Sequence, residues 1–179
     1  MRLKNRLMDG AQVRRTLIRI SHEIVEKNRG SRVRLIGIQR RGVPLAAALA
    51  DIIKTVEGDR VPVGVLDITW YRDDLSLVAE HPTIKGTDIP FNITDENIIL
   101  VDDVLYTGRT VRAAIDALME MGRPRSIQLA VLIDRGNREL PIGPDYVGKL
   151  VPTSRDELIS VSVKSLDGED AVDIYSIND

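Results

Sequence analysis

The sequence predicts an α/β domain with a mainly parallel central sheet flanked by helices. Short runs rich in β-branched residues alternate with segments of helical periodicity, as they do in βαβ units. The chain has 179 residues, 43% of them hydrophobic, which is enough for one domain with a buried core. It contains no cysteine, so disulfides cannot support the fold. We therefore expect a single domain over residues 1–179.

The first expected element is a helix over residues 10–29. Asp9 stands at its N-cap, Gln12 at the capping-box position, and Gly30 follows as the C′ glycine. One helical stripe is apolar and consists of Val13, Leu17, Ile20 and Ile24. The opposite stripe is polar and consists of Arg15, Arg19, His22 and Glu26. We expect the helix to bury the first stripe and to expose the second, largely basic one.

The alternation then continues along the chain. We expect a strand over 33–38, a turn over 39–42, a helix over 43–56 and a strand over 61–69. Residues 71–96 show no sustained period and are rich in Asp, Pro, Gly and Thr. A loop of this length in a compact domain is usually a lid, a binding arm or a hairpin, and we expect it to take part in function.

The regular pattern resumes after this loop. We expect a strand over 97–101, a helix over 109–121 and a strand over 126–133. A polar loop follows Asp134, and the short apolar runs 158–163 and 172–177 predict edge strands or a small cap.

Charge and composition exclude several classes of site. Residues 1–45 contain 12 of the 25 Lys and Arg residues but only three of the 27 acidic ones, so a basic face is possible, although a solvated helix surface would look the same. Six aromatic residues are too few for a base-stacking RNA platform. With no cysteine and two histidines, any divalent metal would be held by oxygen ligands, as Mg²⁺ is. There is no signal-peptide pattern and no membrane-spanning run, so we expect a cytoplasmic protein without membrane contact.

The most informative stretch follows the apolar run 98–101. Asp102 and Asp103 come next, and Thr107, Gly108 and Thr110 then open a helix. Open parallel sheets bind ligands at the carboxyl ends of their strands. Hydroxyl groups, free backbone N–H groups and the positive end of the helix dipole would meet there, which favours a phosphate.

Two carboxylates beside a phosphate must contact something other than that anion. A ribose 5-phosphate satisfies both groups, because the acids would accept from the 2′ and 3′ hydroxyls, directly or through Mg²⁺. A bare Asp-Asp pair is often only a turn former or a metal site. No Walker A motif occurs. A phosphoacceptor receiver domain would carry its acidic pair after the first strand, where this chain has Gln39-Arg40-Arg41-Gly42.

Those two arginines end the first strand of the predicted sheet. Arg40 and Arg41 would lie at the same sheet edge as Asp102 and could bind a second anion, such as a diphosphate leaving group. The alternative is a solvated basic turn.

At these residues the sequence resembles a known family. Val101-Asp102-Asp103-Val104-Leu105-Tyr106-Thr107-Gly108-Arg109-Thr110 resembles the phosphoribosyl pyrophosphate (PRPP) motif of type I phosphoribosyltransferases. Segments 67–75, 134–141 and 147–154 are similar to those of the bacterial bifunctional pyrimidine operon attenuator and uracil phosphoribosyltransferase family. The resemblance covers residues 8–154 and is less distinctive beyond them.

The resemblance implies a type I phosphoribosyltransferase-like fold with a flexible lid and a small cap. It also implies two activities: uracil and PRPP would give UMP and diphosphate with Mg²⁺, and a protein loaded with UMP or UTP would bind the leader of pyrimidine operon mRNA. PRPP would compete for the same site, and the protein would be a homodimer or a higher oligomer.

The resemblance also assigns residues. The catalytic residues would be Asp102, Asp103 and Arg41, with both acids toward the metal, directly or through water. The PRPP and nucleotide site would comprise Arg40, Arg41, Arg72, Asp102, Asp103, Val104, Leu105, Tyr106, Thr107, Gly108, Arg109, Thr110 and Arg135.

The RNA surface of the family is basic and lies on a dimer face. Its matching positions here are Arg15, Arg19, His22, Arg138 and Lys149. The chain departs from the expected Thr, His and Arg with Ile18, Asn137 and Gly143, and it has Arg40 where Thr is usual. Two alternatives stay open: a nucleotide-sensing RNA regulator with negligible catalysis, and a phosphoribosyltransferase for another base without an RNA role.

Overall fold

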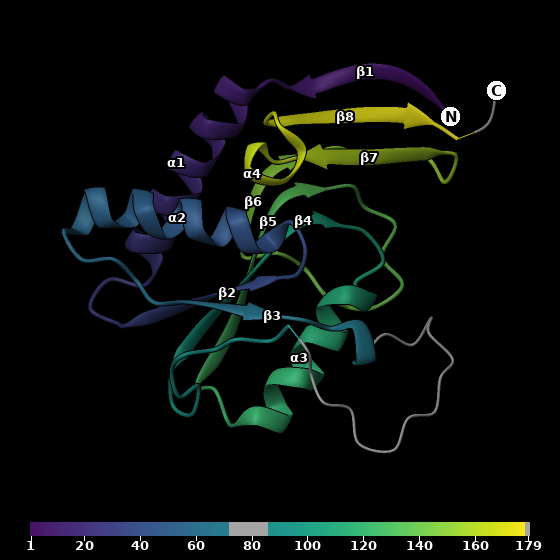
Figure 1. Ribbon diagram of the computed structural model, residues 1–179. Coiled ribbons are helices and arrows are strands. Elements are labelled where there is room, and N and C mark those ends of the chain that lie inside the picture. The colour runs from purple at the N-terminus through teal and green to yellow at the C-terminus, as the bar shows by residue number, and fades with distance from the viewer. Residues whose placement is uncertain (72–85, 178–179) are drawn as a thin grey trace.

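A computed structural model describes residues 1–71 and 86–177 of the chain (Figure 1). A five-stranded parallel sheet with the order β3-β2-β4-β5-β6 forms the centre of the fold. Its strands are β2 (Val33–Ile38), β3 (Val63–Leu66), β4 (Asn97–Leu105), β5 (Ser126–Asp134) and β6 (Tyr146–Leu150). The predicted α/β class with a mainly parallel sheet is confirmed.

Helices cover both faces of this sheet. Helices α1 (Gly10–Lys27) and α2 (Gly42–Glu57) pack on one face, around Leu35, Ile99 and Val101. Helix α3 (Arg109–Met121) packs on the other face, around Ile98 and Leu100. The side chains of β4 thus alternate between two apolar layers, as a strand buried on both faces requires.

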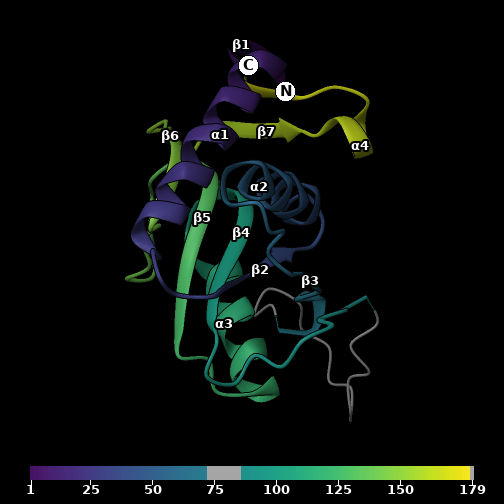
Figure 2. The same cartoon turned by 90° about the vertical axis from the view of Figure 1, so that its left-hand side faces the viewer.

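A small antiparallel sheet with the order β1-β8-β7 forms the cap. Its strands are β1 (Arg2–Met8), β7 (Glu157–Ser162) and β8 (Ala171–Ser176), and the short helix α4 (Lys164–Asp167) joins β7 to β8. In both views this sheet lies at the top of the molecule, with α3 toward the bottom (Figures 1 and 2). The runs after 158 were predicted as edge strands or a cap, whereas β1, their partner, was missed.

Local sequence signals predicted the start of α1 correctly but placed its end too late. Asp9 caps the helix, and both hydrogen bonds of the capping box with Gln12 are present. The predicted stripe Val13, Leu17, Ile20 and Ile24 is buried. The helix ends at Lys27 with Asn28 as its C-cap, so Gly30 follows two residues later, at a φ of 78°. The side chain of Asn28 bonds to the Ile24 carbonyl and to the Tyr146 hydroxyl, which ends the helix earlier than the glycine predicts.

The segment predicted as a lid, 71–96, is described only in part. Residues 72–85, with Arg72, lie outside the described residues. The 3₁₀ turn η1 (Thr69–Tyr71) comes before them, and Asp88 forms a β-bridge with Val65 after them. The Tyr71 hydroxyl bonds to Glu120 of α3 at 2.5 Å. Burial, together with this bond, raises the pKa of Tyr71 to about 12.

Candidate active site

Asp102 and Asp103 lie within the carboxyl-terminal part of the central strand and not beyond it. β4 continues to Leu105, and Asp102 pairs in register with Val131 of β5. The prediction that this strand ends at residue 101 was therefore wrong. The carboxylates interrupt the apolar pattern, but backbone pairing with β5 carries the strand four residues further.

The two carboxylates have different surroundings. Asp102 is only 7% exposed, and its Oδ1 accepts the N–H of Asp103 at 2.9 Å. Burial, and next the charge of Asp103, raise the pKa of Asp102 well above its usual range. Asp103 is half-buried, and its Oδ1 accepts the N–H of Val104 at 2.8 Å. Asp103 therefore offers the more accessible oxygens to a ligand.

The turn over 106–110, here named the phosphate cup, joins β4 to α3. Gly108 is the N-cap of α3 at a φ of 92°, a conformation that side chains with a Cβ rarely adopt. No side chain caps the helix from that position, although Thr107 Oγ1 accepts the N–H of Arg109 at 3.3 Å. The first-turn N–H groups of a helix lack intrahelical partners. With Thr107 and Thr110 they provide the donors that a phosphate requires.

Arg40 and Arg41 follow β2 at the same edge of the sheet, as predicted. The Gln39–Arg40 peptide bond is cis. Gly42 brings this turn against β4, because a Cβ there would lie 2.2 Å from the Val101 carbonyl oxygen and 3.3 Å from the Asp102 Cα. The arginine turn therefore packs directly beside the two acids.

The Arg41 side chain is engaged by the cap. Its Nε and one terminal nitrogen donate to the two carboxylate oxygens of Asp167 at 3.1 and 2.9 Å. This bond raises the pKa of Arg41, with a smaller contribution in the same direction from the charge of Asp103. Asp167 also accepts the N–H of Val163 at 2.8 Å. No signal in the sequence pointed to Asp167, which is 126 residues from Arg41.

Arg135 lies behind the phosphate cup and not within it. Its side chain donates to Thr153 Oγ1 at 2.8 Å and to the carbonyl oxygens of Ser154 and Glu157 at 3.1 and 2.6 Å. The guanidinium carbon lies 4.0 Å from the centroid of the Tyr106 ring. Arg135, only 5% exposed, thus joins the cup to the cap. Its assignment to the nucleotide site stays a prediction.

The residues present fit a magnesium ion that is shared with a substrate. Among the described residues no group of three or more His, Cys, Asp or Glu side chains could hold a metal by itself. Mg²⁺ is commonly bound by one or two carboxylates together with substrate phosphate oxygens. Asp102 and Asp103 would supply that part of the coordination.

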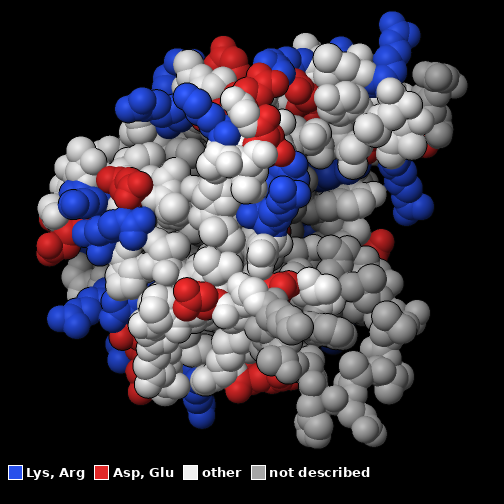
Figure 3. Space-filling model, in the orientation of Figure 1, with Lys and Arg blue, Asp and Glu red and all other residues white. Residues whose placement is uncertain are grey.

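Four of the predicted RNA-binding residues lie on two neighbouring elements, α1 and β6. A hollow of about 360 Å³ is lined by Arg15, Arg19, Gly148 and Lys149, among others. Arg19 donates to the carbonyl oxygens of Val147 and Gly148 at 3.1 and 2.5 Å, which fastens α1 to β6. His22 is exposed on the same helix. Lys and Arg side chains gather over α1 in Figure 3.

Arg138, the fifth of these residues, is not placed as a free surface cation. Its guanidinium donates to Asp134, to the carbonyl oxygens of Tyr106 and Ile142, and more weakly to that of Gly136. Its side chain is 23% exposed. The contribution of Arg138 to an RNA surface stays a prediction.

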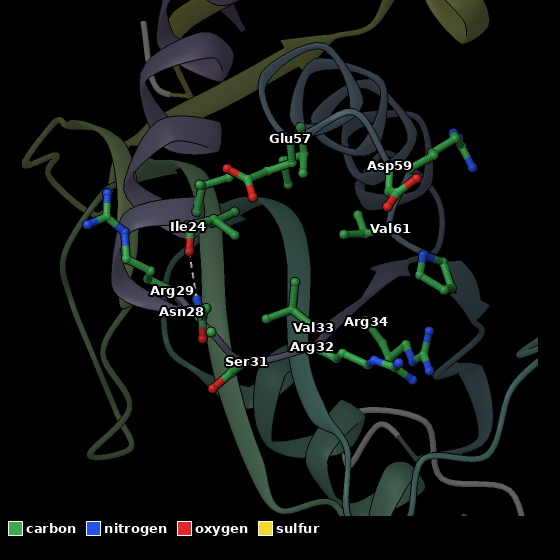
Figure 4. Close-up of a pocket in the computed structure, with 15 residues that line it drawn as sticks. Ile24, Asn28, Arg29, Ser31, Arg32, Val33, Arg34, Glu57, Asp59 and Val61 are labelled. Carbon is green, nitrogen blue, oxygen red and sulfur yellow. Dashed lines mark hydrogen bonds between the residues drawn. The ribbon is translucent and has the colours of Figure 1, made fainter.

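A larger hollow of about 510 Å³ lies at the opposite edge of the sheet (Figure 4). It is lined by the residues after α1, the start of β2 and the residues after α2, so it opens at the amino ends of the strands. The charged residues that line it are Arg29, Arg32, Arg34, Arg60, Glu57 and Asp59. This mixture of charges favours no single class of ligand, and the hollow contains none of the predicted site residues.

The geometry agrees with comparisons with known proteins. The phosphoribosyl transferase domain model matches residues 5–165. The bifunctional protein PyrR of Acetivibrio thermocellus is 64% identical over 175 residues, covering 97% of this chain and 95% of that protein. The chain belongs to the PyrR family of phosphoribosyl transferase domains. The PyrR proteins of Clostridium botulinum and Thermus aquaticus are 60% and 57% identical, each with at least 97% coverage of both chains.

Solved structures support the fold of this PyrR-family chain. The hypoxanthine phosphoribosyltransferase of Trypanosoma cruzi matches with a TM-score of 0.73 at 16% identity, covering 97% of both chains. A hypoxanthine-guanine phosphoribosyltransferase of Bacillus anthracis matches with a TM-score of 0.70 at 20% identity, covering 97% of this chain and 98% of that one. At such identities the likeness establishes the type I phosphoribosyltransferase fold and does not identify the base. Among the helices of the described residues, none is long and apolar enough to span a membrane.

Proposed function

We propose that this PyrR-family protein converts uracil and PRPP to UMP and diphosphate, and that it regulates pyrimidine operon mRNA by binding its leader when loaded with a uridine nucleotide. The observation that carries the enzyme proposal is the convergence of three groups at one edge of the sheet. The phosphate cup follows β4, the two acids lie just before it, and the arginine turn packs beside them.

Each group suits one part of PRPP. The phosphate cup would bind the 5-phosphate through its backbone N–H groups and the hydroxyls of Thr107 and Thr110. Asp103, with the more buried Asp102 behind it, would accept hydrogen bonds from the 2′ and 3′ hydroxyls. Arg41 would hold the diphosphate, and to do so its side chain would exchange Asp167 for the ligand.

The reaction needs no nucleophilic side chain. The C1–oxygen bond to diphosphate breaks, and positive charge develops on the ribose. Uracil N1 then forms the new bond to C1, and the N1 proton passes to the departing diphosphate or to water. The phosphate cup fixes the position of C1, and Arg41 stabilises the departing anion electrostatically. Mg²⁺ bound by the acids and the substrate would supply further positive charge at the leaving group.

The regulatory role rests on the basic face of α1 and β6. Arg15, Arg19, His22 and Lys149 would contact RNA phosphates there. UMP or UTP as corepressor and PRPP as competitor would share one site. RNA binding would therefore depend on the relative concentrations of uridine nucleotide and PRPP. The departures at Ile18 and Gly143 remove polar groups that we expected on this surface, and Asn137 replaces the expected histidine with an amide. We propose a homodimer or a higher oligomer in the cytoplasm as the working form.

A base panel separates this enzyme from a transferase for another base. Nucleotide products would be separated by chromatography after incubation with PRPP, Mg²⁺ and uracil, hypoxanthine or guanine. We expect UMP as the main product, and a purine nucleotide in its place would refute the assignment of uracil.

RNA binding separates the bifunctional proposal from an enzyme without a regulatory role. We expect the complex with a pyrimidine leader RNA to tighten with UMP, to loosen with PRPP and to weaken with salt. A complex that responds to neither ligand would contradict the regulatory part of the proposal.

A further inference from the structure

The rear of the phosphate cup is held through three successive carbonyl groups. The Leu105 carbonyl accepts the N–H of Arg135 at 3.0 Å. The Thr107 carbonyl accepts the N–H groups of Glu139 and Leu140 at 2.9 and 3.2 Å. Between them, the Tyr106 carbonyl accepts a guanidinium N–H of Arg138 at 2.8 Å. The loop over 135–142 thus binds the cup from behind, peptide by peptide.

Because peptide groups are planar, this rear contact sets the direction of the N–H groups at the front of the phosphate cup. In a planar trans peptide the C=O of one residue points opposite to the N–H of the next. A Tyr106 carbonyl that points into the rear loop therefore directs the N–H of Thr107 away from that loop. The same relation holds for the Thr107 carbonyl and the N–H of Gly108. These are the donors that the proposed function assigns to the 5-phosphate.

Of the three carbonyl groups, the one of Tyr106 is bound by a side chain, that of Arg138. The carbonyls of Leu105 and Thr107 are bound by backbone N–H groups, which a side-chain substitution leaves in place. The Tyr106 carbonyl is bound by a side chain, which a substitution removes.

Arg138 is itself held rigidly in this place. Asp134, 8% exposed at the end of β5, accepts from one terminal nitrogen at 2.5 Å. The Ile142 carbonyl accepts from Nε at 2.8 Å. Asp134 also accepts the N–H of Gly136 at 3.0 Å through its other oxygen. The guanidinium is thus held by three acceptors. Asp134, at the end of β5, fixes its position relative to Tyr106.

We propose that Arg138 is a positioning residue, which fixes the Tyr106–Thr107 peptide so that the N–H of Thr107 faces the 5-phosphate of PRPP and UMP. The proposal deepens the proposed function and rests on it. The donors of Arg138 bind groups of this protein, and its predicted place on the RNA surface is a separate prediction. Arg138 does not touch the ligand in this account; it acts through one peptide group.

The test compares the binding of UMP with that of uridine, which differs only in lacking the 5-phosphate. Arg138→Met keeps much of the side-chain length and removes every donor. We expect it to weaken UMP binding about tenfold or more, as the loss of one hydrogen bond to an anion does, and to change uridine binding less than about twofold. Arg138→Lys, which can still donate to the Tyr106 carbonyl, should recover part of the loss.

A control variant and an NMR measurement complete the test. Arg125→Met serves as the matched control, because Arg125 is exposed just before β5, at the opposite edge of the sheet. Amide NMR signals of Thr107 and Gly108, followed during titration with inorganic phosphate, should shift in the wild type and in Arg125→Met and shift much less in Arg138→Met. Should Arg138→Met fail to fold, the same comparison is made with Arg138→Lys, for which we expect a smaller loss in the same direction.

The results distinguish the role of Arg138 from the proposed function on which it rests. A wild type that binds UMP no tighter than uridine would contradict the proposed function itself. A wild type that favours UMP, with Arg138 variants that favour it equally, would overturn only the role of Arg138. Equal loss of UMP and uridine binding would also overturn it, because it would show a general structural defect in place of a phosphate-specific one.

Discussion

Arg41 and Asp167 form a two-pronged ion pair that joins the end of β2 to the cap, with nitrogen to oxygen distances of 2.9 and 3.1 Å. The pair connects the sheet edge that carries the acids with a segment 126 residues later in the chain. Because the side chains are 33% and 22% exposed, solvent screens the pair only in part. The free protein thus holds its proposed leaving-group arginine in a defined place.

Asp167→Asn should change the acid dependence of stability. The bond from Arg41, and next the N–H of Val163, lower the pKa of Asp167. A carboxyl group whose pKa is lowered by folding stabilises the fold above its ordinary value of about 4 and loses that contribution as the pH falls through the lowered value. The melting temperature of the variant should therefore be below that of the wild type at pH 7, and the difference should vanish in acid.

Thermal melting between about pH 2 and pH 7 measures this difference. Asp59→Asn, which removes an exposed acid after α2, is the matched control and should leave the profile unchanged. A constant difference in melting temperature between wild type and Asp167→Asn at every pH would show that the ion pair contributes no pH-dependent stability.

Asp102→Asn should stabilise the free protein while it impairs the enzyme. The Asp102 carboxylate is buried beside a second acid, and both effects disfavour its charged form. An amide keeps the acceptor for the Asp103 N–H and removes the charge. We expect about 1 kcal/mol of added stability at pH 8, or about 2–4 °C in melting temperature, with turnover strongly reduced.

Calorimetry of the ligand-free variant, with turnover measured on the same preparation, tests this combination. A lower melting temperature at pH 8 would indicate that the buried carboxylate is already compensated. It would contradict the account of Asp102 as a destabilising group retained for function.

Asp103→Asn should lower turnover by about a hundredfold and leave the fold intact. Asp103 is half-buried, and the Val104 N–H that it accepts can be accepted equally by an amide oxygen. The substitution weakens its bonds to the ribose hydroxyls, which are stronger when the acceptor is charged. Circular dichroism establishes that the variant is folded. Normal kinetics in that folded variant would remove Asp103 from the site.

Arg15→Gln should weaken RNA binding and reduce its dependence on salt. Each phosphate contact that is lost lowers the slope of log affinity against log salt by about one. Arg15 lines the hollow between α1 and β6. Filter binding at several salt concentrations gives the slope, and Arg125→Gln at the far edge of the sheet is the control. An unchanged slope for Arg15→Gln would exclude a phosphate contact at that residue.

The sequence predicted the central sheet because its signals are local. The apolar run before Asp102, the capping box at Asp9 and the turn at Gly108 are each confirmed by the structure. The strand β1 was missed because its residues are mostly exposed and polar, and it forms only by pairing with β8 at the far end of the chain.

The site could be predicted only in part, for a similar reason. The acids, the phosphate cup and the arginine turn each lie in one continuous segment, and parallel pairing brings their ends together. The contacts of Arg41 with Asp167 and of Arg138 with the Tyr106 carbonyl depend on how the cap and the rear loop pack. No spacing in the sequence encodes those contacts, so neither could be predicted.

The most direct measurement of the central claim is the release of diphosphate from PRPP in the presence of Mg²⁺, with and without uracil. We expect release that requires both Mg²⁺ and uracil, yields UMP in equal amount and falls about a hundredfold in a folded Asp103→Asn variant. Release that proceeds equally without uracil, or no release from protein that binds PRPP, would contradict the claim that this edge of the sheet is a uracil phosphoribosyltransferase site.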